Sequence, residues 1–152
     1  MAVSKEQIIA SLQKSYSMEV ETVLNYLANS LDLEGVRAEF IKQALATDIQ
    51  EELSHAQQLG NRIKQLGGTI LGSLSLTFDQ KTLQPPKDST DVLTVIKGVL
   101  QAEEEAITQY NALIKLTDGV DYVTQDLAIT LLGAEEAHRQ QFQGYLKEYM
   151  KK

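Results

Sequence analysis

Hydrophobic residues recur every three or four positions along four long stretches of the chain, which is the period of an amphipathic α-helix. The predicted helices cover about residues 4–33, 36–66, 88–118 and the remainder to about 150. Ser4 and Gln7 have the spacing of a capping box at the start of the first helix. The pattern therefore predicts an all-α protein with four helices.

The connections between the predicted helices differ sharply in length. Short turns join the first helix to the second and the third to the fourth, so each pair should form an antiparallel hairpin. The segment 67–88 between the pairs reaches ~70 Å when extended, which exceeds the ~45 Å length of a helix of ~30 residues. The sequence therefore predicts one domain over residues 1–152, a four-helix bundle with one long crossover between the second and third helices. Five apolar crossover residues are expected to pack on the bundle: Ile70, Leu71, Leu74, Leu76 and Phe78.

Each apolar stripe is interrupted near its middle by polar side chains that the helical phase turns inward. The residues concerned are Glu19, Glu52, His55, Glu103, Glu135 and His138. Glu21 and Glu104 share rows with lysines and are expected to face solvent. Glu51 is not included in the set, because Ala134 stands at the equivalent place on the fourth helix.

The two halves of the chain carry the same pattern and form an imperfect internal repeat. Glu19 and Glu52 are 33 residues apart, and Glu103 and Glu135 are 32 residues apart. Each half supplies one Glu and one Glu-x-x-His, whose i,i+3 spacing puts both side chains on one helical face.

Four carboxylates cannot be buried in a bundle without compensation of their charge. Two divalent cations would balance four glutamates, and oxygen with imidazole ligands suits iron, manganese or zinc better than calcium or magnesium. A glutamate on each of two helices, with Glu-x-x-His on the other two, is the ligand set of di-iron carboxylate bundles. The sequence therefore predicts a dinuclear metal site.

Three further polar residues accompany this set. Tyr26 and Tyr110 each follow a glutamate of the set by seven residues. They are expected to be core residues that donate hydrogen bonds to the ligand carboxylates, with a redox role as the alternative. Asp48, one turn before Glu52, is either an outer group, an access site for cations or an ordinary partly hydrated residue.

Composition narrows the class of protein. The absence of cysteine excludes disulfides, iron–sulfur ligation and thiolate zinc sites, and fits a reducing cytoplasm. No segment resembles a signal peptide or is long and apolar enough to span a bilayer. A net charge of -7 favours cations over nucleic acid as partners. We therefore expect a cytoplasmic protein with no membrane or nucleic-acid partner.

Three motifs resemble those of the bacterioferritins and related ferritin-like proteins, and the likeness covers essentially the whole chain. They are EVETVLNYL, EELSHAQQLGNRIKQLGG and DYVTQDLAITLLGAEEAH. The resemblance implies two iron ions per subunit, for which manganese or zinc can substitute, bridged by Glu52 and Glu135. It also implies four terminal ligands: Glu19, Glu103, His55 and His138. Bacterioferritins bind haem through a methionine at the position of Leu53, so no haem is expected.

The resemblance implies a ferroxidase that oxidises Fe²⁺ with O₂ or H₂O₂ for iron storage and detoxification. The chain ends without the family's fifth helix, as in the starvation-type mini-ferritins, so a homo-oligomeric shell of twelve or twenty-four subunits is expected. Two alternatives remain open at this point. One is a di-metal redox enzyme, such as a rubrerythrin-like peroxidase or a manganese-catalase-like enzyme. The other is a DNA-protecting mini-ferritin shell, whose usual basic tail this sequence lacks.

Overall fold

The computed structural model describes residues 2–151, and these form four long helices, one short 3₁₀ turn and no strand. The elements are α1 (Lys5–Asp32), α2 (Glu39–Gln65), η1 (Ser73–Ser75), α3 (Val92–Thr117) and α4 (Tyr122–Tyr149). The predicted all-α bundle with one long crossover, which is the ferritin-like arrangement, is confirmed. Within residues 2–151, none of the helices has the length and apolar character needed to cross a membrane.

Capping contacts fix where the helices begin. The Ser4 hydroxyl accepts a hydrogen bond from the Gln7 amide at 3.2 Å, and the Gln7 side chain accepts one from the Ser4 amide at 2.8 Å. This confirms the predicted capping box. Asp91 and Asp121 each accept from the amide three residues on at 3.0 Å, so α3 begins just after Asp91 and not near residue 88. The second helix also begins later than predicted, because residues 35–38 form a turn.

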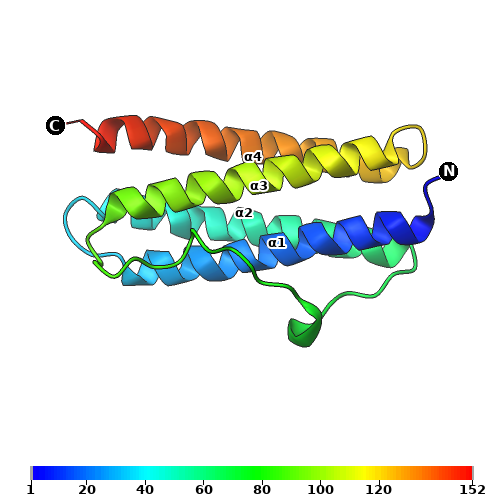
Figure 1. Ribbon diagram of the computed structural model, residues 1–152, viewed down its shortest axis with the longest axis horizontal. Helices are drawn as coiled ribbons and strands as arrows, with labels where there is room; N and C mark the ends of the chain where they lie inside the picture. The colour runs from blue at the N-terminus through cyan, green and yellow to red at the C-terminus, as the bar shows by residue number, and fades with distance from the viewer. Residues whose placement is uncertain (1, 152) are drawn as a thin grey trace.

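The helices pack as two antiparallel hairpins, α1 with α2 and α3 with α4, and α1 also lies along α3 (Figure 1). Two apolar clusters fill the interior. One includes Tyr26, Ile41 and Phe142, and the other is built around Leu12 and Leu59. The polar interruptions of the apolar stripes fall between these clusters, at mid-height of the bundle.

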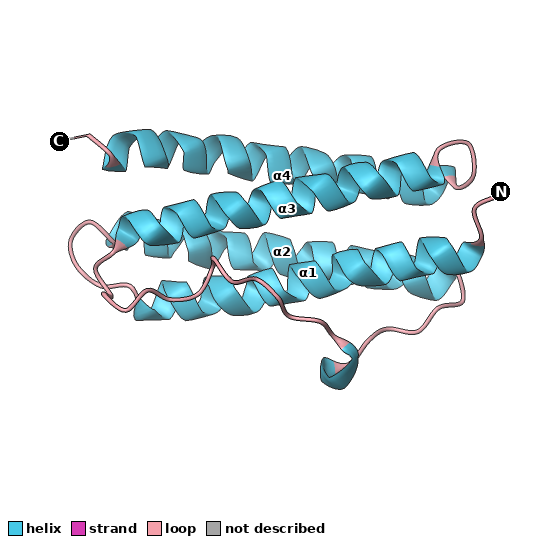
Figure 2. Cartoon of the chain, in the orientation of Figure 1, coloured by secondary structure: helices cyan, strands magenta, loops and turns pink. Residues whose placement is uncertain are grey.

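The crossover runs along the outside of α1 from the end of α2 to the start of α3, and it bulges outward at η1 (Figure 2). Leu74 is fully exposed, and Ile70 and Phe78 are more than a third exposed. The expectation that the apolar crossover residues pack on the bundle is wrong for Leu74, because the chain leaves the helices around η1. The crossover is held instead by Leu83, which is 1% exposed and belongs to the apolar cluster around Tyr26.

Glu21 also departs from its predicted place on a solvent-facing row. It is 5% exposed, and its carboxylate oxygens accept hydrogen bonds from the amides of Asp79 at 3.0 Å and Gln80 at 2.9 Å. The crossover covers this row of α1, and its backbone N–H groups need acceptors when they are removed from water. Glu104 is exposed as predicted and pairs with Arg139 at 3.1 Å.

Gly98 marks a close approach of the crossover to α3. A Cβ added here would lie 2.4 Å from the Thr82 carbonyl oxygen and 3.2 Å from Leu83 Cα, both backbone atoms that cannot rotate away. We expect Gly98→Ala to lower the free energy of unfolding by about 1–3 kcal/mol, although alanine normally stabilises a helix relative to glycine by about 1 kcal/mol. Denaturant unfolding measures the change. Gly144→Ala on α4, where nothing lies within 4 Å of the added Cβ, is the matched control and should not destabilise; equal shifts in both variants would contradict the close packing.

Candidate metal centre

The six residues predicted as metal ligands lie together between the two apolar clusters, and every helix contributes at least one. They are Glu19 on α1, Glu52 and His55 on α2, Glu103 on α3, and Glu135 and His138 on α4. Each is at most 6% exposed. All six side chains therefore form one buried cluster, as their helical spacing predicts.

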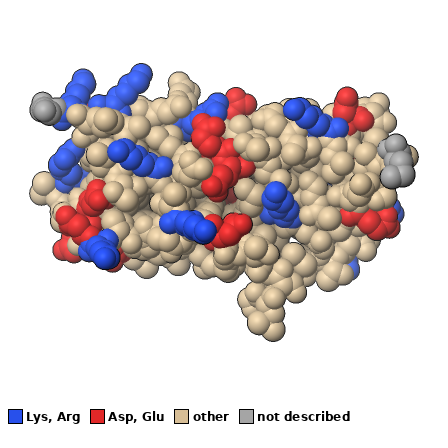
Figure 3. All heavy atoms as spheres, viewed as in Figure 1, with Lys and Arg blue, Asp and Glu red and all other residues tan. Residues whose placement is uncertain are grey.

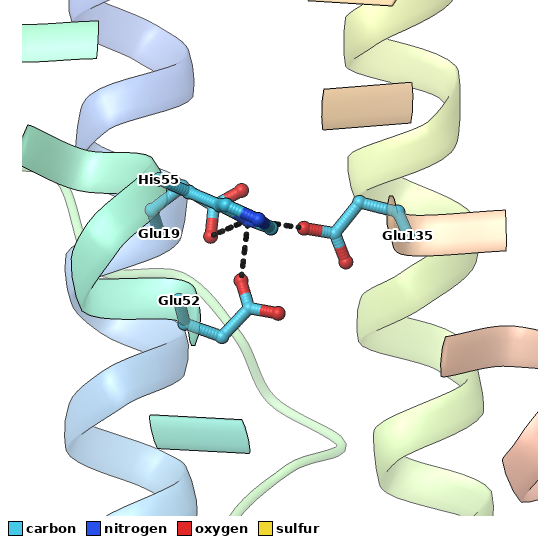
Figure 4. Close-up of side chains that lie close together, drawn as sticks. All are labelled: Glu19, Glu52, His55 and Glu135. Atoms are coloured by element: carbon cyan, nitrogen blue, oxygen red, sulfur yellow. Dashed lines mark hydrogen bonds and ion pairs between the residues drawn. The ribbon is translucent and has the colours of Figure 1, made fainter. Parts of the chain in front are cut away.

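One group of four residues, the first half-site, surrounds the imidazole of His55. Its Nδ1 atom lies 3.1 Å from Glu135 Oε1, 3.6 Å from Glu52 Oε2 and 3.7 Å from Glu19 Oε2 (Figure 4). One ligand atom from each of the four residues lies within 4.8 Å of the others. These distances describe a set of donors that converge on one point.

A second group, the second half-site, surrounds His138 in the same way. Its Nδ1 atom lies 3.2 Å from Glu52 Oε1, 3.7 Å from Glu135 Oε2 and 3.8 Å from Glu103 Oε1. These four residues again offer ligand atoms within 4.8 Å of one another.

Glu52 and Glu135 belong to both half-sites, and each divides its two oxygens between them. Glu52 turns Oε2 toward His55 and Oε1 toward His138, and Glu135 turns Oε1 toward His55 and Oε2 toward His138. Glu19 and Glu103 each approach one histidine only. Two glutamates therefore face both half-sites and the other four residues face one each; the bridging and terminal roles stay a prediction.

The two tyrosines lie beside the glutamates, and each forms a hydrogen bond with a glutamate of the other half of the chain. Tyr26 on α1 donates a hydrogen bond to Glu103 Oε1 at 2.7 Å, and Tyr110 on α3 donates one to Glu19 Oε1 at 2.5 Å. Burial and the neighbouring carboxylates raise the pKa of both phenols well above 10.0, so both keep their protons. The prediction that Tyr26 and Tyr110 donate hydrogen bonds to glutamates of the cluster is confirmed.

Burial raises the pKa of three of the four glutamates. Burial and then Glu135 raise the pKa of Glu19 above 4.5, and burial and then Glu19 raise the pKa of Glu52 to about 7. The pKa of Glu103 is also raised well above 4.5, mainly by burial and next by Glu135. The pKa of Glu135 is lowered, because its interactions with Glu103 and both histidines outweigh the effects of burial and of Glu52.

The two histidines carry the compensating positive charge in the absence of cations. Burial would lower the pKa of His55 and His138, but the carboxylates that surround each imidazole, Glu135 first, raise it to about 12. A cation that binds Nδ1 must therefore displace a proton, so metal affinity should increase with pH.

Several buried ligand atoms make no hydrogen bond within residues 2–151. They are Glu19 Oε2, Glu52 Oε1, Glu103 Oε2 and His138 Nδ1. An unsatisfied buried polar atom costs about 1–3 kcal/mol, so a cluster of such atoms indicates a missing partner. A cavity of about 10 Å³, close to the volume of one water-sized particle, lies between the four glutamates and side chains of α1, α3 and the crossover, and neither histidine lines it. Both the donor types and the unpartnered atoms fit divalent cations.

Asp48 and Glu51 form an outer carboxylate pair beside His138. Glu51 Oε2 contacts His138 Nε2, the nitrogen that faces away from the second half-site, and Asp48 Oδ1 lies 3.8 Å from the same nitrogen. Burial is the largest of the effects that raise the pKa of Asp48 to about 6. The sequence analysis left Glu51 out because its repeat position holds Ala134. The i,i+3 spacing of Asp48 and Glu51, which puts them on one face of α2, is the signal that would have found this pair.

Comparisons with known proteins agree with the four-helix fold. A family model described as the ferritin-like domain matches residues 9–151. The chain is 26% identical over 147 residues to a DNA protection during starvation protein from Pyrococcus furiosus, covering 95% of this chain and 79% of that protein. It is also similar to the bacterioferritin-related protein of Bacteroides fragilis, described as a dodecameric thioferritin, with 26% identity and a TM-score of 0.82 over 97% of this chain and 88% of that chain. A ferritin-like diiron-carboxylate protein from Bacillus anthracis str. Ames shares the fold with 20% identity and a TM-score of 0.83, over 96% of this chain and 99% of that chain.

Proposed function

We propose that this chain, which belongs to the ferritin-like family, is a ferroxidase that binds two Fe²⁺ ions between its helices and oxidises them for iron storage and detoxification. The observation that carries the proposal is the division of the Glu52 and Glu135 oxygens between two half-sites that each contain a histidine. Four glutamates supply a charge of −4 when ionised, which two Fe²⁺ ions would balance. A site for a single ion would not require a carboxylate whose two oxygens are directed toward two different half-sites.

The chemistry that this geometry favours is a two-electron oxidation. Two Fe²⁺ ions give one electron each, so that O₂ with two protons becomes H₂O₂, or H₂O₂ with two protons becomes two water molecules. Holding both ions side by side lets the oxidant accept the two electrons together, which avoids the release of a radical. Glu19 and Glu103 each approach one half-site only.

Tyr26 and Tyr110 hold the terminal carboxylates in place. Each phenol donates to the oxygen of a glutamate on the facing hairpin, so it fixes the orientation of that carboxylate whether or not a cation is bound. Hydrogen bonds of this kind to a ligand typically change metal affinity or activity by about 10–100-fold.

Storage can be distinguished from a two-metal redox enzyme, such as a rubrerythrin-like peroxidase or a manganese-catalase-like enzyme, by the size of the particle and its iron content. We expect light scattering of the purified protein to give a closed homo-oligomeric shell, because the related thioferritin from Bacteroides fragilis is described as dodecameric. After aerobic loading and gel filtration, the particle should retain many more than two iron ions per chain. A dimer that retains only two metal ions per chain would support the redox enzyme and contradict storage.

DNA protection is a second candidate function, favoured by the similarity to the Pyrococcus furiosus protein. The net charge of -7 opposes it, and acidic side chains gather across the middle of the face shown in Figure 3. We expect duplex DNA to bind weakly, and to dissociate as salt is raised, because phosphates are repelled by an acidic surface. A gel shift at physiological salt measures this; tight retention of DNA would support the second candidate.

A further inference from the structure

The two half-sites match in their four ligands but differ in what lies behind their histidines. Behind His138 are Glu51 and Asp48, both within reach of its outer nitrogen Nε2. The repeat relates these two positions on α2 to Ala134 and Leu131 on α4, neither of which carries a carboxylate. The outer carboxylates are therefore a feature of one half-site only.

Burial does not distinguish the half-sites. The side chains of His55 and His138 are 8% and 7% exposed, and those of Glu19 and Glu103 are 3% and 2% exposed. Each histidine also turns the same nitrogen, Nδ1, toward the glutamates. The groups behind the histidines are therefore a clear difference between the half-sites.

The contact with Glu51 has a direct effect on the imidazole as a ligand. When His138 is neutral, a carboxylate at Nε2 holds the proton on that nitrogen and leaves the lone pair of Nδ1 directed into the half-site. It also fixes the plane of the ring and makes Nδ1 a stronger electron-pair donor. Asp48 adds negative charge 3.8 Å from Nε2, and its Oδ2 atom is buried without a hydrogen-bond partner among the described residues.

We propose that Glu51 is a positioning residue for His138 and that it makes the two half-sites unequal, so that the first divalent cation binds at the second half-site. Asp48 reinforces the effect by its charge. This inference rests on the proposed function, because it assumes that both half-sites bind cations. It adds an order to their filling: the half-site of Glu103 and His138 fills before that of Glu19 and His55.

Calorimetric titration of the metal-free full chain with Zn²⁺ tests the order without any oxidation reaction, and Co²⁺ absorption gives a second readout of the ligand set. Wild type should show two steps of one cation each, with the first about 10–100-fold tighter. Glu103→Ala should remove the tight step and Glu19→Ala the weak one, which assigns each step to a half-site.

Glu51 variants separate orientation from charge. Glu51→Ala should weaken the tight step by about 10–100-fold and leave the weak step unchanged. Glu51→Gln, which keeps an oxygen that accepts from Nε2–H, should retain most of the tight binding. If the glutamine variant loses as much as the alanine variant, Glu51 does not act by positioning the imidazole, and the proposal is overturned.

The internal repeat allows a gain-of-function control. Ala134→Glu places a carboxylate behind His55 at the position related to Glu51, so this variant should tighten the weak step. The double variant Glu51→Ala/Ala134→Glu should transfer the tight step to the first half-site, where Glu19→Ala then removes it. Two equal steps in wild type, unchanged in Glu51→Ala, would overturn the inference and leave the two-cation site intact. Failure of wild type to bind two cations per chain would instead overturn the proposed function.

Discussion

Replacing Glu52 with alanine is expected to abolish the fast phase of Fe²⁺ oxidation. In wild type this phase should saturate at two Fe²⁺ ions per chain, because the six clustered residues form two candidate half-sites. Glu52 presents one oxygen to each half-site. Its loss would remove a ligand from both ions, and the distance between the ions would no longer be fixed by a shared carboxylate. Misplacement of reacting groups by about 1 Å can cost roughly 100-fold in rate, and we expect a loss of at least about that size.

Stopped-flow absorbance after mixing metal-free protein and Fe²⁺ with air-saturated buffer measures this phase. Glu104→Ala is the matched control, because Glu104 is a glutamate adjacent to Glu103 in sequence but lies exposed on α3 and pairs with Arg139. The control should oxidise Fe²⁺ as wild type does. Fast oxidation that survives in Glu52→Ala would show that Glu52 does not bridge the two ions.

The ligand cluster could be predicted from the sequence because it depends on helical phase alone. Once Leu12 and Tyr26 are placed inside α1, Glu19 between them must also face inward, and the i,i+3 spacing then brings His55 beside Glu52. The repeat extends the same reasoning to α3 and α4. The inward direction of Tyr26 and Tyr110 could be predicted from the same helical phase, because each follows an inward glutamate by seven residues.

The residues that were misplaced depend on contacts between segments distant in the sequence. Glu21 is buried by a crossover whose path over α1 leaves no periodic signal, and Leu74 is exposed because that path bulges at η1. Glu51 is half-exposed and was left out because its repeat position holds Ala134, whereas its partner, His138, is on α4. Helical periodicity describes which way a residue faces but not which segment covers it.

The metal-free protein is expected to lose stability between pH 5 and pH 8. The pKa of Glu52 rises from 4.5 to about 7 on folding, so its stabilising contribution is complete below 4.5 and is lost as pH rises to about 7. The pKa of each histidine rises from 6.5 to about 12, so their contribution is complete below 6.5 and falls at higher pH. The lowered pKa of Glu135 has the opposite sign but acts below 4.5, outside this interval. Each pKa unit corresponds to on the order of 1 kcal/mol.

Divalent cations should reverse this trend, because they replace the protons that the folded cluster retains. Saturating Zn²⁺ at 100 times its dissociation constant stabilises the native state by about 2.7 kcal/mol for each site, and the gain in melting temperature should be larger at pH 8 than at pH 6. Thermal unfolding at a fixed protein concentration measures both effects.

Two isosteric variants test the same electrostatics in opposite directions. Glu52→Gln removes a charge that burial disfavours, so the metal-free variant should melt higher than wild type at pH 8 and respond little to Zn²⁺. Glu135→Gln removes a charge that both histidines favour, so the metal-free variant should melt lower than wild type at the same pH. Opposite shifts are the result expected if the glutamates and histidines form one coupled cluster. If both variants shift the melting temperature alike and respond to Zn²⁺ as wild type does, the inward glutamates do not form a cation site.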